Sequence, residues 1–188
     1  QRPASVVKEL LENAIDAEAG EITLSIKDGG RTLIAVTDNG KGMSAVDAEM
    51  SFQRHATSKL STFNDLFNLS TMGFRGEALA SIAAVSHVSL TTQTEEDATG
   101  FSIRIEGGKK KSASETICPK GTHIEVKNLF FNVPARRNFL KSDTVEFHHI
   151  EDTFIHVAIA HPEVSFKLLH NEEVHYNLQS TNLKRRIT

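Results

Sequence analysis

Hydrophobic residues near the start of the chain recur three and four positions apart, as they do along one face of an α-helix. The apolar stripe runs from Val6 to Ile15, Pro3 suits a first helical turn, and Gly20 suits a C-terminal stop. This pattern predicts a helix that begins at Pro3 and ends before Gly20.

The hydrophobic pattern then changes to a period of two, which is typical of strands. Apolar and polar residues alternate over residues 22–26, the segment Asp28-Gly29-Gly30 is rich in turn formers, and the chain returns through the apolar residues 33–36. A β-hairpin is therefore expected directly after the first helix.

The rest of the chain continues this mixture of the two periods. Residues 51–72 mix short helical pieces with Ser, Thr and Asn, and "GFRGEALASIAAV" (73–85) opens a helix directly on glycines. Further strands are expected around residues 88–90, 101–105, 124–126, 164–169 and 174–178, and helices over 134–141 and 144–161. Because helices and hairpins alternate without a regular βαβ rhythm, an α+β fold with one sheet covered on one face by helices is favoured over a doubly wound sheet.

Composition limits the classes of function. The net charge is −3, with 21 basic and 24 acidic residues, so affinity for nucleic acid would have to come from local runs such as "GGKKK" (107–111) and "LKRR" (183–186), which are usually solvated surface. The single cysteine, Cys118, excludes an internal disulfide and fits a reducing compartment. No apolar run approaches the roughly 20 residues of a membrane span, and no secretory leader is visible, so a cytoplasmic location is expected.

Polar residues border the apolar stripe of the first helix. Glu9, Asn13 and Asp16 fall in one narrow sector of it, where their side chains can converge on a cleft beside the core. A carboxylate there could take a proton from water, and an amide oxygen one turn away could join a Mg²⁺ shell. A solvated helix face with an ordinary polar pair explains the same pattern.

Three other segments have candidate chemistry. In "TDNGKGM", Asp38 follows a hydrophobic strand and could accept an N–H from a flat ligand, although "DNG" is also a common turn. In "MGFRGEAL", two glycines flank an arginine at the start of a helix, where free N–H groups favour phosphate oxygens. Between them, "RHATSK" (54–59) is a basic, hydroxyl-rich loop that could fold over phosphates.

Familiar alternatives are absent from the sequence, with one exception. It contains no G-x-x-x-x-G-K-[ST], G-x-G-x-x-G or G-x-S-x-G motif. His148, Asp152 and His156 are spaced by four along an expected helix and could ligate Zn²⁺ or Ni²⁺, but there is no fourth ligand and no H-E-x-x-H motif, so a plain polar helix face is strongly favoured.

Five segments in chain order resemble the ATP-site motifs of the GHKL ATPases: "KELLENAIDA", "DNGKGM", "RHATSK", "GFRGEALASI" and "GT" at Gly121-Thr122. "RHATSK" with "GFRGEAL", and the later "NVPARRNFL", are similar to segments of the N-terminal ATPase domain of the MutL mismatch-repair proteins. The resemblance runs from Arg2 to about His170. It implies the GHKL (Bergerat) fold, a mixed and mostly antiparallel sheet covered on one face by helices.

The resemblance also implies roles for individual residues. Glu9 would be the general base for water attacking the γ-phosphate of ATP, Asn13 would ligate Mg²⁺, and Asp38 would accept the adenine amino group. The other implied nucleotide contacts are Gly40, Gly42 and Met43 along the base, Thr122 beneath it, Thr57, Ser58 and Lys59 in a lid, and Gly73, Phe74, Arg75 and Gly76 at the phosphates.

For the whole protein, the resemblance implies slow Mg²⁺-dependent ATP hydrolysis that acts as a conformational and dimerisation switch. The implied partners are DNA, a mismatch-recognition protein and other repair factors, and a second copy of the full-length protein. MutL proteins have a leader segment before the first helix and a second domain after this one. Since the chain starts at Gln1, we expect residues 1–188 to be one ATP-binding domain of a longer protein, monomeric by itself.

Two other functions remain open from the sequence. The ATPase domain of a type II topoisomerase shares the acid-to-Asn helix and the D-x-G-x-G pattern, but it would need a lid different from "RHATSK". A non-catalytic, nucleotide-responsive interaction module would keep the pocket without hydrolysing ATP.

Overall fold

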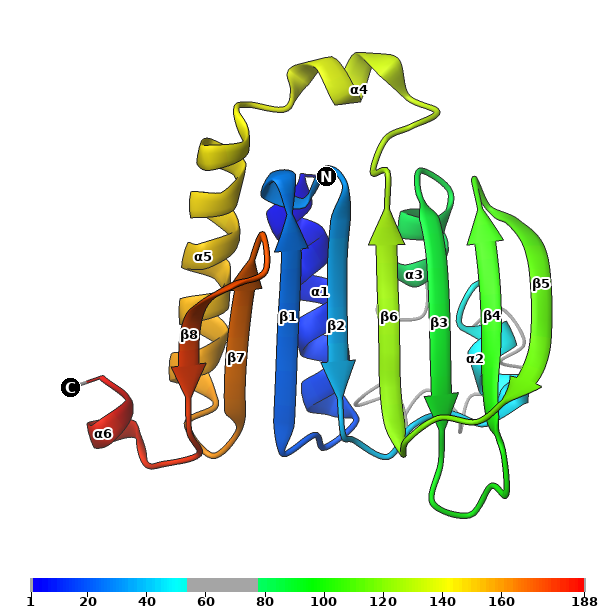
Figure 1. Ribbon diagram of the computed structural model, residues 1–188, viewed down its shortest axis with the longest axis horizontal. Coiled ribbons are helices and arrows are strands. Elements are labelled where there is room, and N and C mark those ends of the chain that lie inside the picture. Colours follow the sequence, from blue (N-terminus) through cyan, green and yellow to red (C-terminus); the bar gives the residue numbers. More distant parts are fainter. Residues whose placement is uncertain (1, 54–77, 188) are drawn as a thin grey trace, which may run out of the picture.

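The computed structural model describes residues 2–53 and 78–187, and these residues build one mixed sheet with helices on one side (Figure 1). The strand order across the sheet is β5-β4-β3-β6-β2-β1-β7-β8. Neighbouring strands of this sheet are antiparallel except β1 and β7, which run parallel. The strands are β1 (Glu21–Lys27), β2 (Leu33–Asp38), β3 (His87–Gln93), β4 (Gly100–Glu106), β5 (Lys109–Thr116), β6 (Gly121–Lys127), β7 (Ser165–His170) and β8 (Glu173–Leu178).

Helices α1, α3 and α5 lie behind the strands in the view of Figure 1, and α4 spans the upper end of the sheet between β6 and α5. The helices are α1 (Pro3–Asp16), α2 (Ala45–Met50), α3 (Ala78–Ala83), α4 (Pro134–Phe139), α5 (Asp143–Ala160) and α6 (Leu183–Arg186), with a 3₁₀ turn, η1 (Asp28–Gly30). The opposite face of the sheet therefore remains available to polar side chains.

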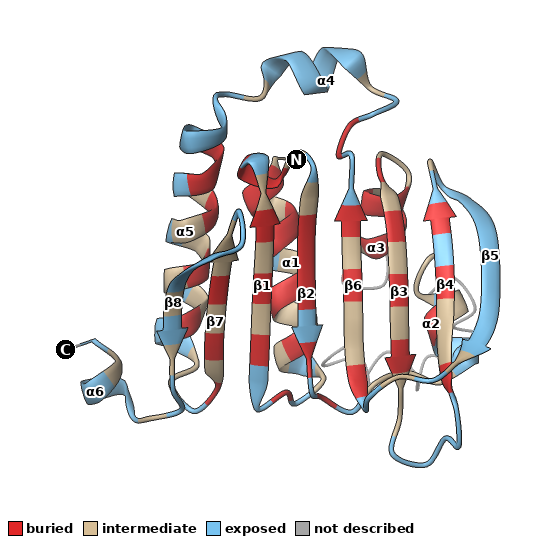
Figure 2. Cartoon of the chain, in the orientation of Figure 1, coloured by how far each residue is buried: buried red, intermediate tan, exposed pale blue. Residues whose placement is uncertain are grey.

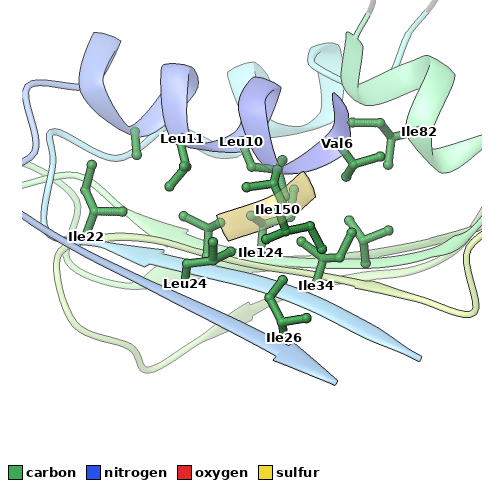
Figure 3. Close-up of a cluster of buried hydrophobic side chains, with 14 of the residues drawn as sticks. Val6, Leu10, Leu11, Ile22, Leu24, Ile26, Ile34, Ile82, Ile124 and Ile150 are labelled. Atoms are coloured by element: carbon green, nitrogen blue, oxygen red, sulfur yellow. The ribbon is translucent and has the colours of Figure 1, made fainter. Parts of the chain in front are cut away.

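The core lies between α1, α5 and the sheet (Figure 3). Leu10 and Leu11 of α1 point down onto Ile22 and Leu24 of β1, and all four are at most 2% exposed. Burying one such side chain contributes about 1.5–3 kcal/mol relative to leaving it exposed. Buried and half-buried residues alternate along β1 and β3, so each strand presents its apolar side to the helices (Figure 2).

The β1–β2 turn is packed against the start of α5. Gly29 has φ +60°, and a Cβ there would lie 2.5 Å from the carbonyl oxygen of Asp143. Glycine is required at this position both by the left-handed backbone and by the close approach of α5. The hairpin and the last long helix are thus held together at one point.

The sequence predictions for the main elements are confirmed. The first helix, the hairpin with its turn at residues 28–30, the later strands and the two helices expected over 134–141 and 144–161 all form, with ends within about three residues of those expected. The α+β class, with one mixed and mostly antiparallel sheet covered on one face, is confirmed as well.

Three elements were missed by the hydrophobic pattern. α2 buries only Ala48, β5 is exposed along nearly its whole length, and α6 buries no residue. The lysine run at residues 109–111, expected to be plain solvated surface, is the start of the edge strand β5. Charged residues are common on edge strands, since they discourage pairing with other chains.

The "LKRR" segment, also expected to be plain surface, includes one structural arginine. The guanidinium of Arg186 donates hydrogen bonds to the carbonyl oxygens of Ala158, Pro162, Val164 and Gln179. It therefore satisfies carbonyl groups at the end of α5 and at the start of β7.

None of the helices in the described part of the chain combines the length and the apolar character needed to cross a lipid bilayer.

Candidate functional site

A row of polar residues crosses three central strands at one end of the sheet. Asp38 ends β2, Thr122 lies opposite it on β6, and Thr92 lies opposite Thr122 on β3. Asp38 is 8% exposed and Thr92 is 0% exposed, whereas the other inward positions of these strands are apolar. Buried polar side chains need hydrogen-bond partners, and their concentration at this end of the sheet marks it as a candidate functional site.

The carboxylate of Asp38 is held by backbone N–H groups. The N–H of Gly40 donates to Oδ1 of Asp38 at 2.9 Å. Burial raises the pKa of Asp38 above that of an ordinary aspartate, and hydrogen bonds from the backbone of Gly40 and Thr122 oppose this rise. A carboxylate accepts about four hydrogen bonds, so Asp38 retains capacity for a donor from a ligand.

The turn after Asp38 is attached to the end of α1. The N–H of Lys41 donates to the carbonyl oxygen of Ala17 at 2.8 Å. A Cβ at Gly40 would lie 2.5 Å from that same oxygen. From the sequence, Gly40 was expected to leave room for a flat ligand. The close contact between this turn and α1 already requires a glycine at this position.

The other side of the turn is attached to β3. Gly42 has φ +70°, and a Cβ there would lie 2.1 Å from the carbonyl oxygen of Gln93. The N–H of Met43 donates to Oγ1 of Thr92 at 2.9 Å, and the Met43 side chain packs against the core. The turn 40–43 is thus fixed between α1 and β3, at the open end of the sheet.

Thr92 is a functional candidate that the sequence analysis missed. Its Oγ1 donates to the carbonyl oxygen of Gly121 at 3.0 Å and lies 3.1 Å from Oγ1 of Thr122. In the sequence, the only sign of this role is that a threonine occupies the third inward position of β3. The other two inward positions, Val88 and Leu90, are apolar. Threonine is common in strands, so that indication was weak.

Glu9 and Asn13 lie on α1 beside this end of the sheet. Both are half-buried, and Asn13 lies one turn before Ala17, whose carbonyl oxygen holds the turn at Gly40. Glu9 lies one turn before Asn13, about 6 Å away along the helix axis. Within the described part of the chain, no hydrogen bond joins either side chain to another residue.

Asp16, expected to converge with Glu9 and Asn13, is exposed and borders a different hollow. That hollow, of about 290 Å³, lies between α1 and α5 and is also lined by Glu12, His156 and His161. Only two of the three polar residues singled out on α1 therefore remain with the site.

Seven of the predicted site residues lie outside the described residues. They are Thr57, Ser58 and Lys59 of the expected lid and Gly73, Phe74, Arg75 and Gly76 of the expected phosphate turn. The described structure resumes at α3, whose residues Leu79, Ile82 and Ala83 are buried. These seven positions keep the status of sequence predictions.

The alternative metal site on α5 is not formed. Among residues 2–53 and 78–187, no group of three or more His, Cys, Asp or Glu side chains could hold a metal ion, and this includes His148, Asp152 and His156.

Burial raises the pKa of the Cys118 thiol, which disfavours the reactive thiolate.

Comparisons with known proteins agree on one family. Residues 1–132 match the family described as histidine kinase-, DNA gyrase B-, and HSP90-like ATPase. The chain is 60% identical over 188 residues to the DNA mismatch repair protein MutL of Christiangramia forsetii, and 58% identical over 187 residues to that of Flavobacterium johnsoniae. It spans about 30% of the length of these relatives.

Solved structures give the same result. The Aquifex aeolicus MutL ATPase domain complexed with ADP superposes with a TM-score of 0.80 at 30% identity, covering 100% of this chain and 67% of that one. The N-terminal domain of a DNA repair protein gives a TM-score of 0.82 at 27% identity, covering 99% of this chain and 55% of that one.

Proposed function

The chain belongs to the MutL branch of the histidine kinase-, DNA gyrase B- and HSP90-like ATPases, and from this premise we propose that it binds ATP with Mg²⁺ at the end of the sheet where Asp38, Thr92 and Thr122 meet. In the whole protein, this site would hydrolyse ATP slowly. The observation that carries the proposal is the buried, backbone-held carboxylate of Asp38 beside a helix that presents the half-buried Glu9 and Asn13.

The base end of the proposed site suits adenine. The remaining lone pairs of Asp38 can accept a hydrogen from the exocyclic amino group, which guanine lacks at that ring position. Gly40, Gly42 and Met43 form the adjoining wall, and Thr122 lies next to the carboxylate on the neighbouring strand. The ADP bound by the Aquifex aeolicus domain, which shares this fold, supports a nucleotide here.

The positions of Asn13 and Glu9 on α1 suit the rest of the nucleotide. Asn13 lies one turn before Ala17, which contacts the turn that follows Asp38, and Glu9 lies one turn further from the base. The amide oxygen of Asn13 is a suitable ligand for Mg²⁺, which when bound neutralises charge on the phosphates. By resemblance, Thr57, Ser58 and Lys59 would cover the phosphates, and the segment Gly73, Phe74, Arg75 and Gly76 would supply backbone donors to them.

Glu9 would act as the general base. Its carboxylate is half-buried, faces the same edge as Asn13 and is not bound to another described residue, so it can accept a proton from a water molecule at the far end of the nucleotide. General bases of this kind typically contribute about 10² to 10⁴ in rate.

The first test exchanges Glu9 for its amide. Glu9→Gln should lower Mg²⁺-dependent ATP hydrolysis by about 10² to 10⁴ while ATP affinity changes by less than about threefold, because only the proton acceptor is removed. Steady-state phosphate release and equilibrium binding measure the two quantities on the same protein.

Glu12→Gln is the matched control, since Glu12 lies on the same helix, pairs with the exposed Lys8 at 3.8 Å and borders the hollow between α1 and α5 rather than the proposed site. Wild-type rates in Glu9→Gln would refute the role of Glu9. A wild-type protein that binds ATP but never hydrolyses it would favour the non-catalytic interaction module instead.

For the protein as a whole, the family suggests a switch in DNA mismatch repair. Nucleotide binding would bias conformation and dimerisation of the full-length protein, rather than drive rapid turnover. We infer DNA, a mismatch-recognition protein and other repair factors as partners, residues 1–188 as one ATP-binding domain, and a cytoplasmic location. The names of the relatives support the repair role, and relaxation of supercoiled DNA by the full-length protein would favour the topoisomerase alternative.

A further inference from the structure

We propose that Thr92 is a positioning residue that makes the Thr122 hydroxyl a hydrogen-bond acceptor toward the base, so that the site selects a 6-amino purine over a 6-keto purine. The inference rests on the proposed nucleotide site and specifies how that site chooses its base. The observations behind it are the hydrogen bonds that join Thr92 to Gly121, Met43 and Thr122.

Thr92 has one hydroxyl proton and three close neighbours. The carbonyl oxygen of Gly121, at 3.0 Å, can only accept, so the Thr92 proton goes to it. The N–H of Met43, at 2.9 Å, can only donate, so it occupies a lone pair of Thr92. The third neighbour, Oγ1 of Thr122 at 3.1 Å, must then donate its own proton to Thr92.

The Thr122 hydroxyl consequently has no proton left for a ligand. Thr122 is half-buried and directly opposite Asp38 on the neighbouring strand, so its remaining lone pair and the carboxylate of Asp38 lie on the same edge of the sheet. Two adjacent acceptors suit an exocyclic amino group, which has two hydrogens. They repel a keto oxygen, which has none.

The surroundings of Thr92 keep this arrangement from rearranging. Thr92 is 0% exposed, so water cannot take the place of either partner. Gly121 has φ +110°, and a Cβ there would lie 2.1 Å from the carbonyl oxygen of Asp38, so the β6 backbone is held against β2. An unsatisfied buried group is costly, which keeps the Thr92 proton on the Gly121 carbonyl.

The test compares ATP with inosine triphosphate, whose base has a keto oxygen at position 6 in place of the amino group and a hydrogen on the neighbouring N1. Dissociation constants are measured for the wild-type protein, Thr92→Val and Thr92→Ser. Wild type should prefer ATP, and Thr92→Val should reduce the ratio of the two affinities by roughly five- to tenfold, because the Thr122 hydroxyl is then free to donate to the keto oxygen. Thr92→Ser retains the hydroxyl and should restore the wild-type ratio.

Thr91→Val is the matched control, because Thr91 is the neighbouring residue on the opposite face of β3 and its hydroxyl lies near Ser102 rather than the site. It should leave the ratio unchanged. If Thr92→Val weakens both nucleotides equally, Thr92 is merely structural and the inference is overturned. If wild type binds neither nucleotide, the proposed function itself fails.

Thr122→Val provides an independent test in case Thr92→Val does not fold. It removes the acceptor hydroxyl of Thr122 itself, at a half-buried position. The ratio of the affinities for ATP and inosine triphosphate should fall by a similar factor. In the double variant, Thr92→Val should have no further effect, because the two hydroxyls act as one unit. A Thr122→Val protein with the wild-type ratio would overturn the inference.

Discussion

At the scale of residues, the proposed site combines the polar side chains of Glu9, Asn13 and Asp38 with the buried hydroxyl of Thr92. Glu9, Asn13 and Asp38 could be proposed from the sequence because they border apolar segments and because their order resembles a known family. Thr92 could not be predicted in the same way. Its role depends on the pairing of β3 with β6, which brings Gly121 and Thr122 beside it from a distant part of the chain.

A single residue, Asp38, is expected to set the preference for ATP over GTP. Asp38→Ala should weaken ATP binding by about tenfold or more and reduce the preference over GTP, because the charged acceptor for the amino group is lost. Competition binding with both nucleotides measures the effect. Asp152→Ala, at an exposed position on α5, is the control; unchanged affinity and selectivity in Asp38→Ala would mean that the adenine lies elsewhere.

At the scale of elements, strands and helices were predictable wherever one side is apolar and the other polar. α5 shows this well, since its buried residues Phe147, Ile150, Phe154 and Ala158 recur every three or four positions. β5 and α6 have no such periodicity because their side chains are nearly all exposed, and only their contacts with β4 and with the end of α5 define them. The hydrophobic pattern of a short segment cannot reveal an element that is stabilised only by contacts with a neighbouring element.

The contact between α5 and the β7–β8 hairpin is expected to depend on pH through His170. The ring of His170 stacks on Phe147 with centroids 3.7 Å apart, and His175 lies 5.5 Å away. Burial and, secondarily, the charge of His175 lower the pKa of His170, whereas Asp28, Asp143 and Glu151 act in the opposite direction. The folded protein therefore binds a proton at His170 less readily than the unfolded chain does.

The expected consequence is a loss of stability on acidification. Because the folded pKa is below the unfolded value, the contribution of His170 is complete above about pH 6.5 and is lost as the pH falls toward the folded pKa. His170→Phe should keep the stacking and flatten this dependence in urea unfolding between pH 7 and pH 5. His148→Phe, at an exposed position, should leave it unchanged, and an equally steep loss in His170→Phe would contradict the assignment.

At the scale of the whole molecule, the fold class was predictable but the strand order was not. The alternation of helices and hairpins indicated an α+β sheet with one covered face, and this is confirmed. The parallel pairing of β1 with β7 joins segments from opposite ends of the chain, and nothing in either segment specifies its partner. Such long-range pairings are set by the packing of α1 and α5 on the same face.

The whole domain should respond to nucleotide. A ligand that binds only the folded state adds about 2.7 kcal/mol at 100 times its Kd, so a non-hydrolysable ATP analogue with Mg²⁺ should raise the thermal midpoint by several degrees. The midpoint is compared with and without Mg²⁺, with a GTP analogue as the control. An equal shift with both analogues would argue against base selection by Asp38 and Thr92.

The separation of Asp38 and Thr122 along the chain also affects how the protein is made. β2 borders β6 in the finished sheet, so the β1–β2 hairpin leaves the ribosome with the edge of β2 unpaired until residues 121–127 have followed. At ordinary rates of translation this takes on the order of ten seconds. Until then the hairpin exposes apolar side chains and lacks Thr122 beside Asp38, so we expect the nascent chain to be most prone to aggregation in this interval.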